Sequence, residues 1–133
     1  MFCHPFCRLP ICPFSCLNAK RQFLCRLLSE ACRMKKIPVQ AWSSLQYGYF
    51  QGVFLGSDKY SELNAVLDRI AAENGVTSMA VALAWILRYP GSTQAVIGTT
   101  KQNRIREAAK ATEFELSRKE WYEIYLAAGN DLP

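Results

Sequence analysis

The chain has 133 residues, half of them hydrophobic, and a net charge of +5 from 16 basic and 11 acidic side chains. This composition is typical of a globular protein and excludes a disordered chain, which would hold far less Leu, Ile, Val and Phe. Because no run of about 18 uncharged apolar residues occurs, we expect no membrane-spanning helix and no membrane partner. The apolar opening has neither a preceding basic stretch nor a small-residue cleavage site, so we expect a cytoplasmic protein rather than a secreted one.

The composition changes abruptly after residue 36. Residues 1–36 carry seven basic side chains and one glutamate, a net charge of +6, whereas the remaining 97 residues have a net charge of −1. All six cysteines and the single histidine lie within the first 32 residues, and all seven glycines follow residue 47. We therefore interpret residues 1–22 as a divergent, Cys-rich and poorly ordered segment that is foreign to the domain formed by residues 23–133.

The basic, cysteine-rich opening has three other interpretations, each with weak support. Nucleic-acid binding needs basic charge on a folded face with reading side chains nearby, and here the charge lies on the least foldable segment. The cysteines from Cys3 to Cys16 are separated by three, four and three residues, a poor match to the paired ligands of structural zinc sites. A disulfide framework requires an oxidising compartment, for which the sequence carries no signal. We expect no nucleic-acid partner and no metal site.

The first predicted elements are a helix, a strand and a long loop. Apolar residues recur at three- and four-residue intervals from Phe23 to Cys32 and lead to a basic end at Lys35 and Lys36, which predicts an amphipathic helix. The β-branched, apolar stretch from Ile37 to Trp42 predicts a buried strand. The glycine-bearing segment from Ser43 to about Tyr60 predicts a loop, and long loops after buried strands often carry function.

Two helices are predicted next. Ser61 precedes an apolar pattern that ends at Asn74-Gly75, which indicates a capped helix with a glycine stop. Thr77 can cap a second helix, whose nearly continuous apolar run from Ala80 to Leu87 requires burial of most of its surface before Pro90-Gly91 ends it.

The last part of the chain repeats the strand–turn–helix order. Gln94 to Ile97 predicts a strand, and Gly98-Thr99-Thr100 predicts a turn. A helix from Lys101 to Lys110 should place Ile105 and Ala109 on its inner side and its basic residues outside. Ser117 and Glu120 form a capping-box pattern before a final helix that Gly129 closes.

This alternation of strands and helices predicts parallel strands covered by helices, an α/β fold. Two strands cannot form a sheet buried on both faces, and parallel strands are seldom exposed. Part of the fold is therefore expected to be missing from this chain.

The turn at Gly98, Thr99 and Thr100 is a candidate anion site. A helix N-terminus presents unpaired N–H groups and a positive dipole end, and Arg104, one turn into the helix, could add a charge-assisted contact to a phosphate. Glycine and threonine before a helix are more often only a helix cap, so the sequence signal for an anion site is weak by itself.

Four segments carry a resemblance to a known family. They are VQAWSSL (Val39 to Leu45), ALAWILRYP (Ala82 to Pro90), VIGTTKQNRIREA (Val96 to Ala108) and LSRKEWYEIYLAAGNDLP (Leu116 to Pro133). In this order they resemble the C-terminal portion of the aldo-keto reductases. The resemblance implies a C-terminal fragment of a (β/α)8 TIM barrel, mostly helical with two short parallel strands, the seventh and eighth of the barrel.

The resemblance also implies an NADP(H) site. Trp42 matches the aromatic residue that stacks on the nicotinamide ring, and Ser43 and Leu45 match residues that line the pyrophosphate. The residues that match the site of the adenosine 2′-phosphate and the adenine are Gly98, Thr99, Thr100, Arg104 and Glu107. Ser44 stands where the family usually has proline, which predicts a less rigid start to the loop.

The family's catalytic tetrad of aspartate, tyrosine, lysine and histidine has no counterpart here, so we assign no catalytic residue. His4 lies in the divergent opening, and Tyr47 and Tyr49 have no lysine partner evident from the sequence. A barrel of this kind has about 250 residues or more, so the length predicts a truncated chain, which a misplaced start codon, a frame disruption or a split gene would each produce.

Two hypotheses follow. In the first, the chain is part of an NADPH-dependent reductase that converts a small carbonyl substrate to an alcohol only when the missing portion is supplied. In the second, it is a non-catalytic helical remnant that associates with itself or with another barrel protein through unpaired strands.

Overall fold

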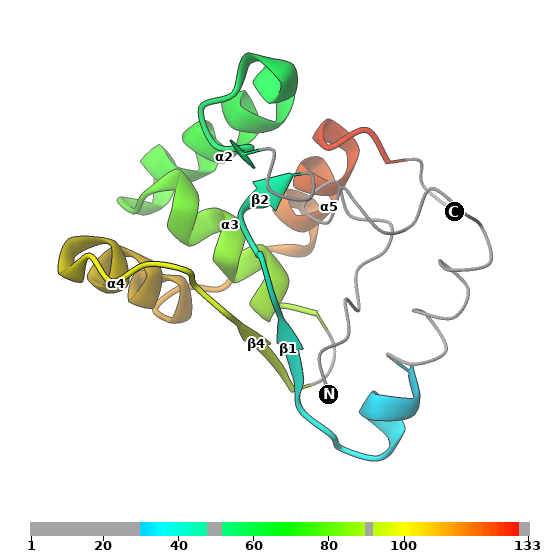
Figure 1. The fold of residues 1–133 in the computed structure, drawn as a ribbon. Coiled ribbons are helices and arrows are strands. Elements are labelled where there is room, and N and C mark those ends of the chain that lie inside the picture. Colours follow the sequence, from blue (N-terminus) through cyan, green and yellow to red (C-terminus); the bar gives the residue numbers. More distant parts are fainter. Residues whose placement is uncertain (1–29, 48–51, 90–91, 131–133) are drawn as a thin grey trace.

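The computed structural model describes residues 30–47, 52–89 and 92–130 (Figure 1). Residues 30–34 are helical, and the Cys-rich opening and the first part of the helix predicted from Phe23 lie outside the described residues. The elements that follow are β1 (Val39–Ala41), β2 (Gln46–Tyr47), β3 (Gly52–Val53), the 3-10 turn η1 (Asp58–Tyr60), α2 (Ser61–Asn74), α3 (Ser78–Leu87), β4 (Thr93–Ala95), α4 (Gln102–Ala109), the 3-10 turn η2 (Lys110–Thr112) and α5 (Arg118–Ala127). The described part of the chain is mostly helical, as predicted.

β1 and β4 form a two-stranded parallel sheet, which confirms the predicted strand direction (Figure 1). Val39 is opposite Thr93 and Ala41 is opposite Ala95. The ladder continues beyond the strands, because the Val96 amide donates to the Ala41 carbonyl at 2.9 Å. Both strands are shorter than expected, and β4 begins one residue earlier than the sequence predicts.

The segment predicted as a loop between Ser43 and Tyr60 contains an additional antiparallel pair. Gln46 of β2 is opposite Val53 of β3, and Tyr47 is opposite Gly52. The Phe54 amide donates to the Leu45 carbonyl at 3.2 Å and extends the pairing by one bond. The two parallel strands were predicted correctly, and this additional antiparallel pair was not predicted, because two residues in each strand are too few to show an alternating pattern.

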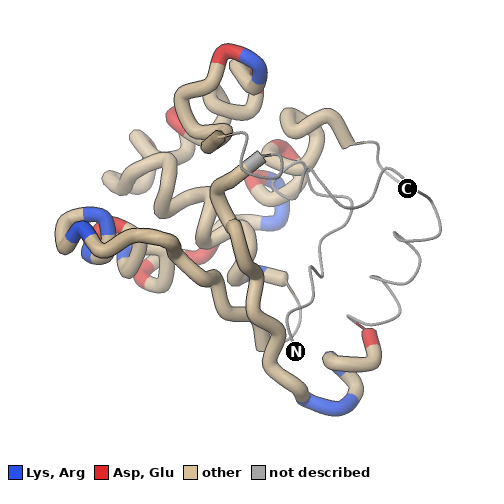
Figure 2. Tube along the Cα trace, viewed as in Figure 1, with Lys and Arg blue, Asp and Glu red and all other residues tan. Residues whose placement is uncertain are grey.

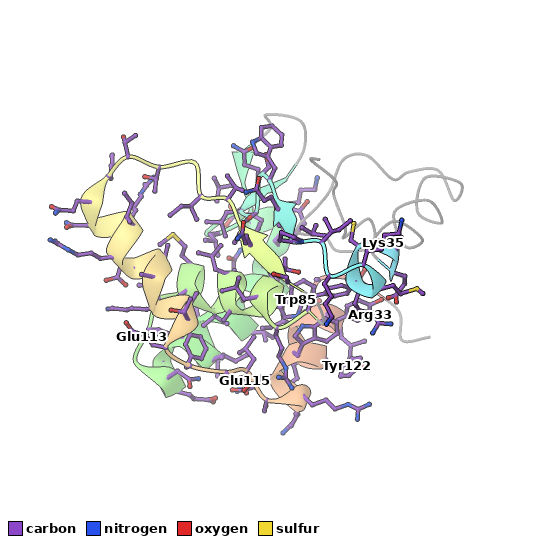
Figure 3. The ribbon with its side chains drawn as sticks, turned by 90° about the horizontal axis from the view of Figure 1, so that it is seen from below. Arg33, Lys35, Trp85, Glu113, Glu115 and Tyr122 are labelled. Atoms are coloured by element: carbon purple, nitrogen blue, oxygen red, sulfur yellow. The ribbon has the colours of Figure 1, made fainter. Side chains whose placement is uncertain are left out.

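The core is centred on α3, whose residues from Ala80 to Ile86 are all buried. α2, α4 and β4 all pack against this helix. Trp85 points into the middle of the molecule (Figure 3) and is 1% exposed. Its indole lies 4.8 Å from that of Trp121 of α5 with an interplanar angle of 9°. The near-continuous apolar run therefore forms a central helix, as expected.

Each ring of this tryptophan pair also bonds the other helix. The Trp85 Nε1–H donates to the Trp121 carbonyl at 3.0 Å, and the Trp121 Nε1–H donates to the Trp85 carbonyl at 3.3 Å. Both indole donors are satisfied, that of the buried Trp85 and that of the partly buried Trp121. The pair thus joins α3 to α5 by one stacking contact and two hydrogen bonds.

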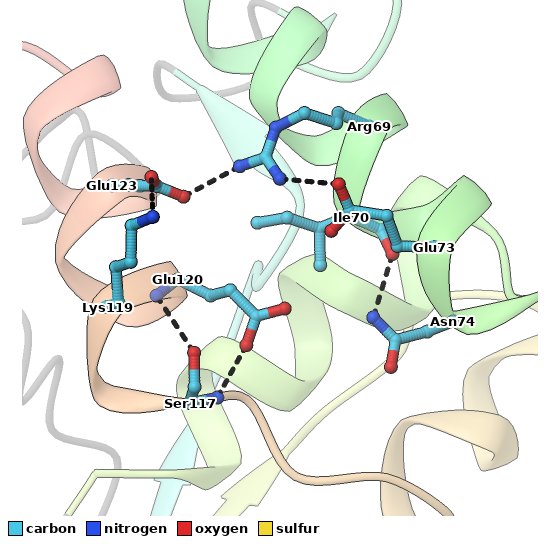
Figure 4. Close-up of polar contacts among 8 residues, drawn as sticks. All are labelled: Arg69, Ile70, Glu73, Asn74, Ser117, Lys119, Glu120 and Glu123. Carbon is cyan, nitrogen blue, oxygen red and sulfur yellow. Dashed lines mark hydrogen bonds and ion pairs between the residues drawn. The ribbon is translucent and has the colours of Figure 1, made fainter.

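Two of the predicted helix caps are present and one is not. The Thr77 hydroxyl accepts from the Ala80 amide at the start of α3, and Ser117 and Glu120 form the reciprocal capping box of α5 (Figure 4). Ser61 does not cap α2, because it is already the first helical residue and Tyr60 takes the cap position without a side-chain hydrogen bond. The preceding 3-10 turn moves the start of the helix by one residue. Gly75 ends α2 with φ of 65°, as predicted.

A network of charged residues joins α2 to α5 at the surface (Figure 4). The Arg69 guanidinium contacts Glu73 at 2.8 Å and Glu123 at 2.7 Å. Glu120, at the start of α5, accepts from the Ser117 amide at 2.6 Å. Its hydrogen bonds with Ser117, chiefly, lower the pKa of the Glu120 carboxyl below its ordinary value, and the nearby Arg69 charge adds to this effect. The ionised carboxylate therefore stabilises the start of the helix.

α4 presents a different face to the core than the sequence predicts. Ala108 is the residue of α4 that is buried, whereas Ile105 is 44% exposed and Ala109 is also exposed. The expected inner face of Ile105 and Ala109 is therefore wrong. Ala108 belongs to the buried core, and α4 contacts α3.

One face of the β1–β4 sheet is covered by α3, and the other is open among the described residues. Ala41 faces the helices and is 5% exposed, while Gln40 and Gln94 are exposed and join through their amides at 3.3 Å. In the part of the chain that is described, no single helix is long and apolar enough to cross a bilayer. The bent pair Asp58–Asn74 and Ser78–Leu87 meets the length and composition criteria together, but its second helix is the buried α3.

Candidate cofactor site at the ends of two parallel strands

The predicted site residues follow the carboxyl ends of β1 and β4. Because these strands are parallel and in register, the segment after Ala41 and the segment after Ala95 leave the sheet at the same edge. Trp42, Ser43 and Leu45 follow the first strand, and Gly98 to Arg104 follow the second. Parallel pairing therefore brings the two predicted halves of the site to one edge of the sheet.

A tight turn holds the residues after β1. Trp42 is 45% exposed, a large fraction for so large an apolar ring. Ser43 has φ of 57°, a left-handed conformation that is uncommon for a residue with a Cβ. The Ser43 carbonyl accepts from the Gln46 amide at 3.0 Å, and the buried Ser44 hydroxyl donates to the Ala41 carbonyl at 2.8 Å. Strained backbone of this kind is often found at functional sites and persists only where its surroundings fix it.

Ser44 stands where the family usually has proline, and a less rigid start to the loop was expected for that reason. In the structure the Ser44 side chain itself restrains this part of the loop. Its side chain is 5% exposed and bonds the last residue of β1, three positions back. A buried hydroxyl bond of this kind restrains the turn without the fixed φ of a proline ring. Leu45 is partly buried against the hydrophobic core, so its side chain anchors the turn rather than lying open to solvent.

The start of α4 presents free main-chain donors. Lys101 is the N-cap residue and forms no side-chain capping bond. The Thr99 hydroxyl accepts from the Lys101 amide at 3.3 Å, so this side chain shapes the turn before the helix. The amides of the first helical turn, residues 102–104, therefore have no capping side chain, and the positive end of the helix dipole adds to their attraction for an anion.

Basic residues lie along the start of this helix (Figure 2). Lys101, Arg104 and Arg106 are exposed, and among the described residues none of them forms an ion pair or a side-chain hydrogen bond. Glu107 is less available, because its carboxylate pairs with Lys110 at 3.1 Å. Among the described residues Arg104 therefore has an unpaired guanidinium, and it belongs to the same first turn of α4 as the uncapped amides.

Gly98 has open space around it. A Cβ built at this position would meet nothing within 4 Å, and Thr100 is exposed beside it. The protein's own packing thus does not require glycine at this position, and the space on this side of the turn is free for another molecule. Main-chain amides, a guanidinium and open space fit a phosphate group, and the half-exposed Trp42 ring fits a flat aromatic ring.

Within residues 30–47, 52–89 and 92–130, no group of three His, Cys, Asp or Glu side chains is arranged to hold a metal ion. His4, Tyr49 and the tyrosine side chain at position 47 lie outside what the structure describes. Tyr122 and Tyr125 of α5 lie in an aromatic cluster with Trp121, away from the strand ends. The absence of a catalytic residue therefore stays a prediction.

Asn64 is the residue near this site that the sequence analysis missed. Its side-chain amide makes four hydrogen bonds to main-chain atoms of the segment that follows β3. The available signal was its position on the apolar stripe of α2, three residues before Leu67 and seven before Ala71, where a polar side chain needs partners.

Comparisons with known proteins identify the family. The sequence model of the Aldo/keto reductase family matches residues 10–127. A 6-dehydroglucose reductase of Agrobacterium fabrum is 40% identical over 99 residues, which are 74% of this chain and 32% of that protein. The uncharacterized oxidoreductase YcsN of Bacillus subtilis is 32% identical over 105 residues, 77% of this chain and 34% of that protein. The chain spans about a third of the length of these curated relatives.

A solved structure supports the same conclusion for the fold. A thermostable aldo-keto reductase, crystallised with the inhibitor epalrestat, is similar to this chain with a TM-score of 0.61 and 25% sequence identity. The similarity covers 87% of this chain and 39% of that one. The described helices and parallel strands therefore correspond to a fragment of a TIM barrel, as the sequence predicts. The chain belongs to the aldo/keto reductase family of oxidoreductases, whose members generally use a nicotinamide cofactor.

Proposed function

We propose that this chain forms the NADP(H)-binding part of an aldo-keto reductase. The observation that carries the proposal is the in-register parallel pairing of β1 with β4. This pairing brings the turn of residues 42–45, here named the Trp42 turn, and the start of α4 to the same edge of the sheet. A 2′-phosphate would accept hydrogen bonds from the amides of residues 102–104 and from Arg104. Thr99 and Thr100 would shape this turn, and Gly98 would leave it room.

The Trp42 turn would hold the other end of the cofactor. Trp42 offers an indole on a residue that is 45% exposed, Ser43 fixes the backbone beside it, and Leu45 ties the turn to the core. The bound cofactor would supply hydride to the carbonyl carbon of a substrate. Glu107, which pairs with Lys110, would lie toward the adenine only if that ion pair loosened.

Carbonyl reduction also needs a general acid that protonates the carbonyl oxygen. We assign that group, and the rest of the family's tetrad, to a portion of the barrel that the described residues do not supply. The chain alone is then inactive, and it becomes part of a cytoplasmic reductase when that portion is present. Because the Agrobacterium relative is a 6-dehydroglucose reductase, a sugar carbonyl is the first substrate to test.

The experiment compares two arginines of the same helix. We expect Arg104→Ala to weaken NADPH binding about tenfold, since a charge-assisted contact at an exposed site is lost, and to leave NADH binding nearly unchanged. Arg106→Ala is the matched control, because Arg106 is equally exposed and equally unpaired among the described residues. Binding is followed by energy transfer from tryptophan to the nicotinamide, after circular dichroism establishes that each chain is folded. Equal losses for NADPH and NADH, or equal losses in the two variants, contradict the 2′-phosphate assignment.

A second candidate function is a non-catalytic association module. The observation that favours it is the open face and unpaired edges of the β1–β4 sheet among the described residues. Exposed strand edges pair readily with another chain. Light scattering with size-exclusion chromatography separates the two functions: a stable oligomer that does not bind NADPH favours the module, and a monomer that binds NADPH favours the cofactor site.

A further inference from the structure

The segment from Phe54 to Tyr60 is held by one side chain from α2. The Asn64 Nδ2 donates to the carbonyls of Phe54 at 3.0 Å, Ser57 at 3.2 Å and Tyr60 at 3.0 Å. Its Oδ1 accepts from the Gly56 amide at 3.0 Å. Two N–H groups thus serve three carbonyls, so at least one bond is shared.

This segment is fixed on its other side by the core. Phe54 is fully buried, and the Ser57 and Tyr60 amides donate to the carbonyls of Phe54 and Ser57 at 3.1 and 3.0 Å. The Ser61 amide at the start of α2 donates to the Asp58 carbonyl, which attaches the end of this segment to the helix. Asn64 adds four side-chain hydrogen bonds from α2, and these reach back along the segment as far as Phe54.

Hydrogen bonds continue from this segment to the turn that carries Trp42. The Phe54 amide donates to the Leu45 carbonyl at 3.2 Å, and β2 and β3 pair alongside. The Gln46 amide in turn donates to the Ser43 carbonyl at 3.0 Å. The left-handed Ser43 is therefore supported by a hairpin whose far strand leads to the Asn64 contacts (Figure 1).

We propose that Asn64 is a positioning residue that fixes the Trp42 turn for the nicotinamide end of the cofactor. This inference rests on the proposed function, since it assumes that Trp42 meets the nicotinamide. Without the Asn64 amide the loop loses four of its hydrogen bonds to α2, and the turn samples arrangements in which the Trp42 ring is misplaced. Among the described residues the start of α4 shares no hydrogen bond with this loop, so we expect the adenosine end of the site to be unaffected.

Two ligands separate positioning from general destabilisation. NADPH spans both ends of the site, whereas adenosine 2′,5′-bisphosphate carries the adenosine and the 2′-phosphate but no nicotinamide. We expect Asn64→Ala to weaken NADPH binding about tenfold, as it would if the turn were competent about a tenth of the time, and to leave the bisphosphate affinity unchanged. Asn74→Ala is the matched control on the same helix, where the Asn74 Nδ2 donates to the Ile70 carbonyl at 2.9 Å, and it should change neither affinity.

The outcomes are distinct. If Asn64→Ala weakens the binding of NADPH and of the bisphosphate equally, the residue is merely structural and the inference is overturned. Unchanged NADPH binding in this variant also overturns it. Failure of the unsubstituted chain to bind either ligand contradicts the proposed function instead.

A measurement on the unsubstituted chain covers the case in which Asn64→Ala does not fold. NADPH should slow hydrogen exchange at the Gly56 amide, which donates to Asn64, while the bisphosphate should leave that rate unchanged. Equal exchange rates with the two ligands overturn the inference.

Discussion

The tryptophan pair between α3 and α5 offers a sharp test of the packing. Trp85 and Trp121 stack with 4.8 Å between ring centroids, and each Nε1–H donates to the other's carbonyl. Trp121→Phe keeps an aromatic ring but removes one donor and part of the stacked area. A hydrogen bond contributes about 1 kcal/mol and a stacked pair about 0.5–1.5 kcal/mol, so we expect Trp121→Phe to lower the free energy of unfolding by about 2 kcal/mol.

Trp85→Phe should cost more, because Trp85 is 1% exposed. Its smaller ring leaves a cavity of roughly 40 Å3, and at about 24 cal/mol per Å3 this adds about 1 kcal/mol to the same losses. The expected total is about 3 kcal/mol. The double variant should cost about 1 kcal/mol less than the sum of the single variants, because the stacking energy is lost only once.

The assay is urea unfolding followed by far-ultraviolet circular dichroism, which does not depend on the tryptophan signal. Trp42→Phe is the matched control, since Trp42 is 45% exposed and the same substitution there should change the free energy of unfolding by less than about 0.5 kcal/mol. A Trp121→Phe variant as stable as Trp42→Phe, or strictly additive single variants, would refute the reciprocal arrangement.

Three further predictions concern helix ends and pH. The depressed pKa of Glu120 means that its carboxylate stabilises the fold above its ordinary pKa of 4.5 and that this contribution is lost as the pH falls through the lowered folded value. Glu120→Gln should therefore lower the free energy of unfolding at neutral pH and make that free energy depend less on acid pH. The measurement is unfolding of both chains at several pH values, and the same acid dependence in both chains would contradict the prediction. Lys36 has φ of 54°, so Lys36→Gly should stabilise by about 1 kcal/mol, whereas Gly75→Ala, with φ of 65° and no nearby atoms, should destabilise by a similar amount. Thr77→Ala should cost about 1 kcal/mol while Ser61→Ala costs almost nothing, since only Thr77 caps its helix; equal thermal shifts would contradict the assignment.

The elements that the sequence predicted correctly have local causes. Thr77, Ser117 with Glu120, and Gly75 act on the backbone within a few residues of their own positions, so a pattern of neighbours is enough to identify them. The parallel direction of β1 and β4 follows from the helices between them, which return the chain to the same end of the sheet. The meeting of the two halves of the candidate site at one sheet edge follows from this direction.

The features that were missed depend on partners distant in the sequence or on very short pairings. The β2–β3 pair has two residues in each strand, too few for any periodic signal. The burial of Ala108 and the exposure of Ile105 depend on how α4 packs against α3, a helix distant in the sequence. Asn64 acts on main-chain atoms of a neighbouring loop, and its role could be suspected only from a polar residue on an apolar stripe.

The central claim is that residues 98–104 and Trp42 form two ends of one dinucleotide site. The most direct test is an amide and indole NMR titration of the unsubstituted chain with NADPH. We predict saturable shifts at the amides of residues 98–104 and at the Trp42 indole, with one common dissociation constant. A folded chain whose signals at these positions do not move, or move with unrelated affinities, would contradict the account.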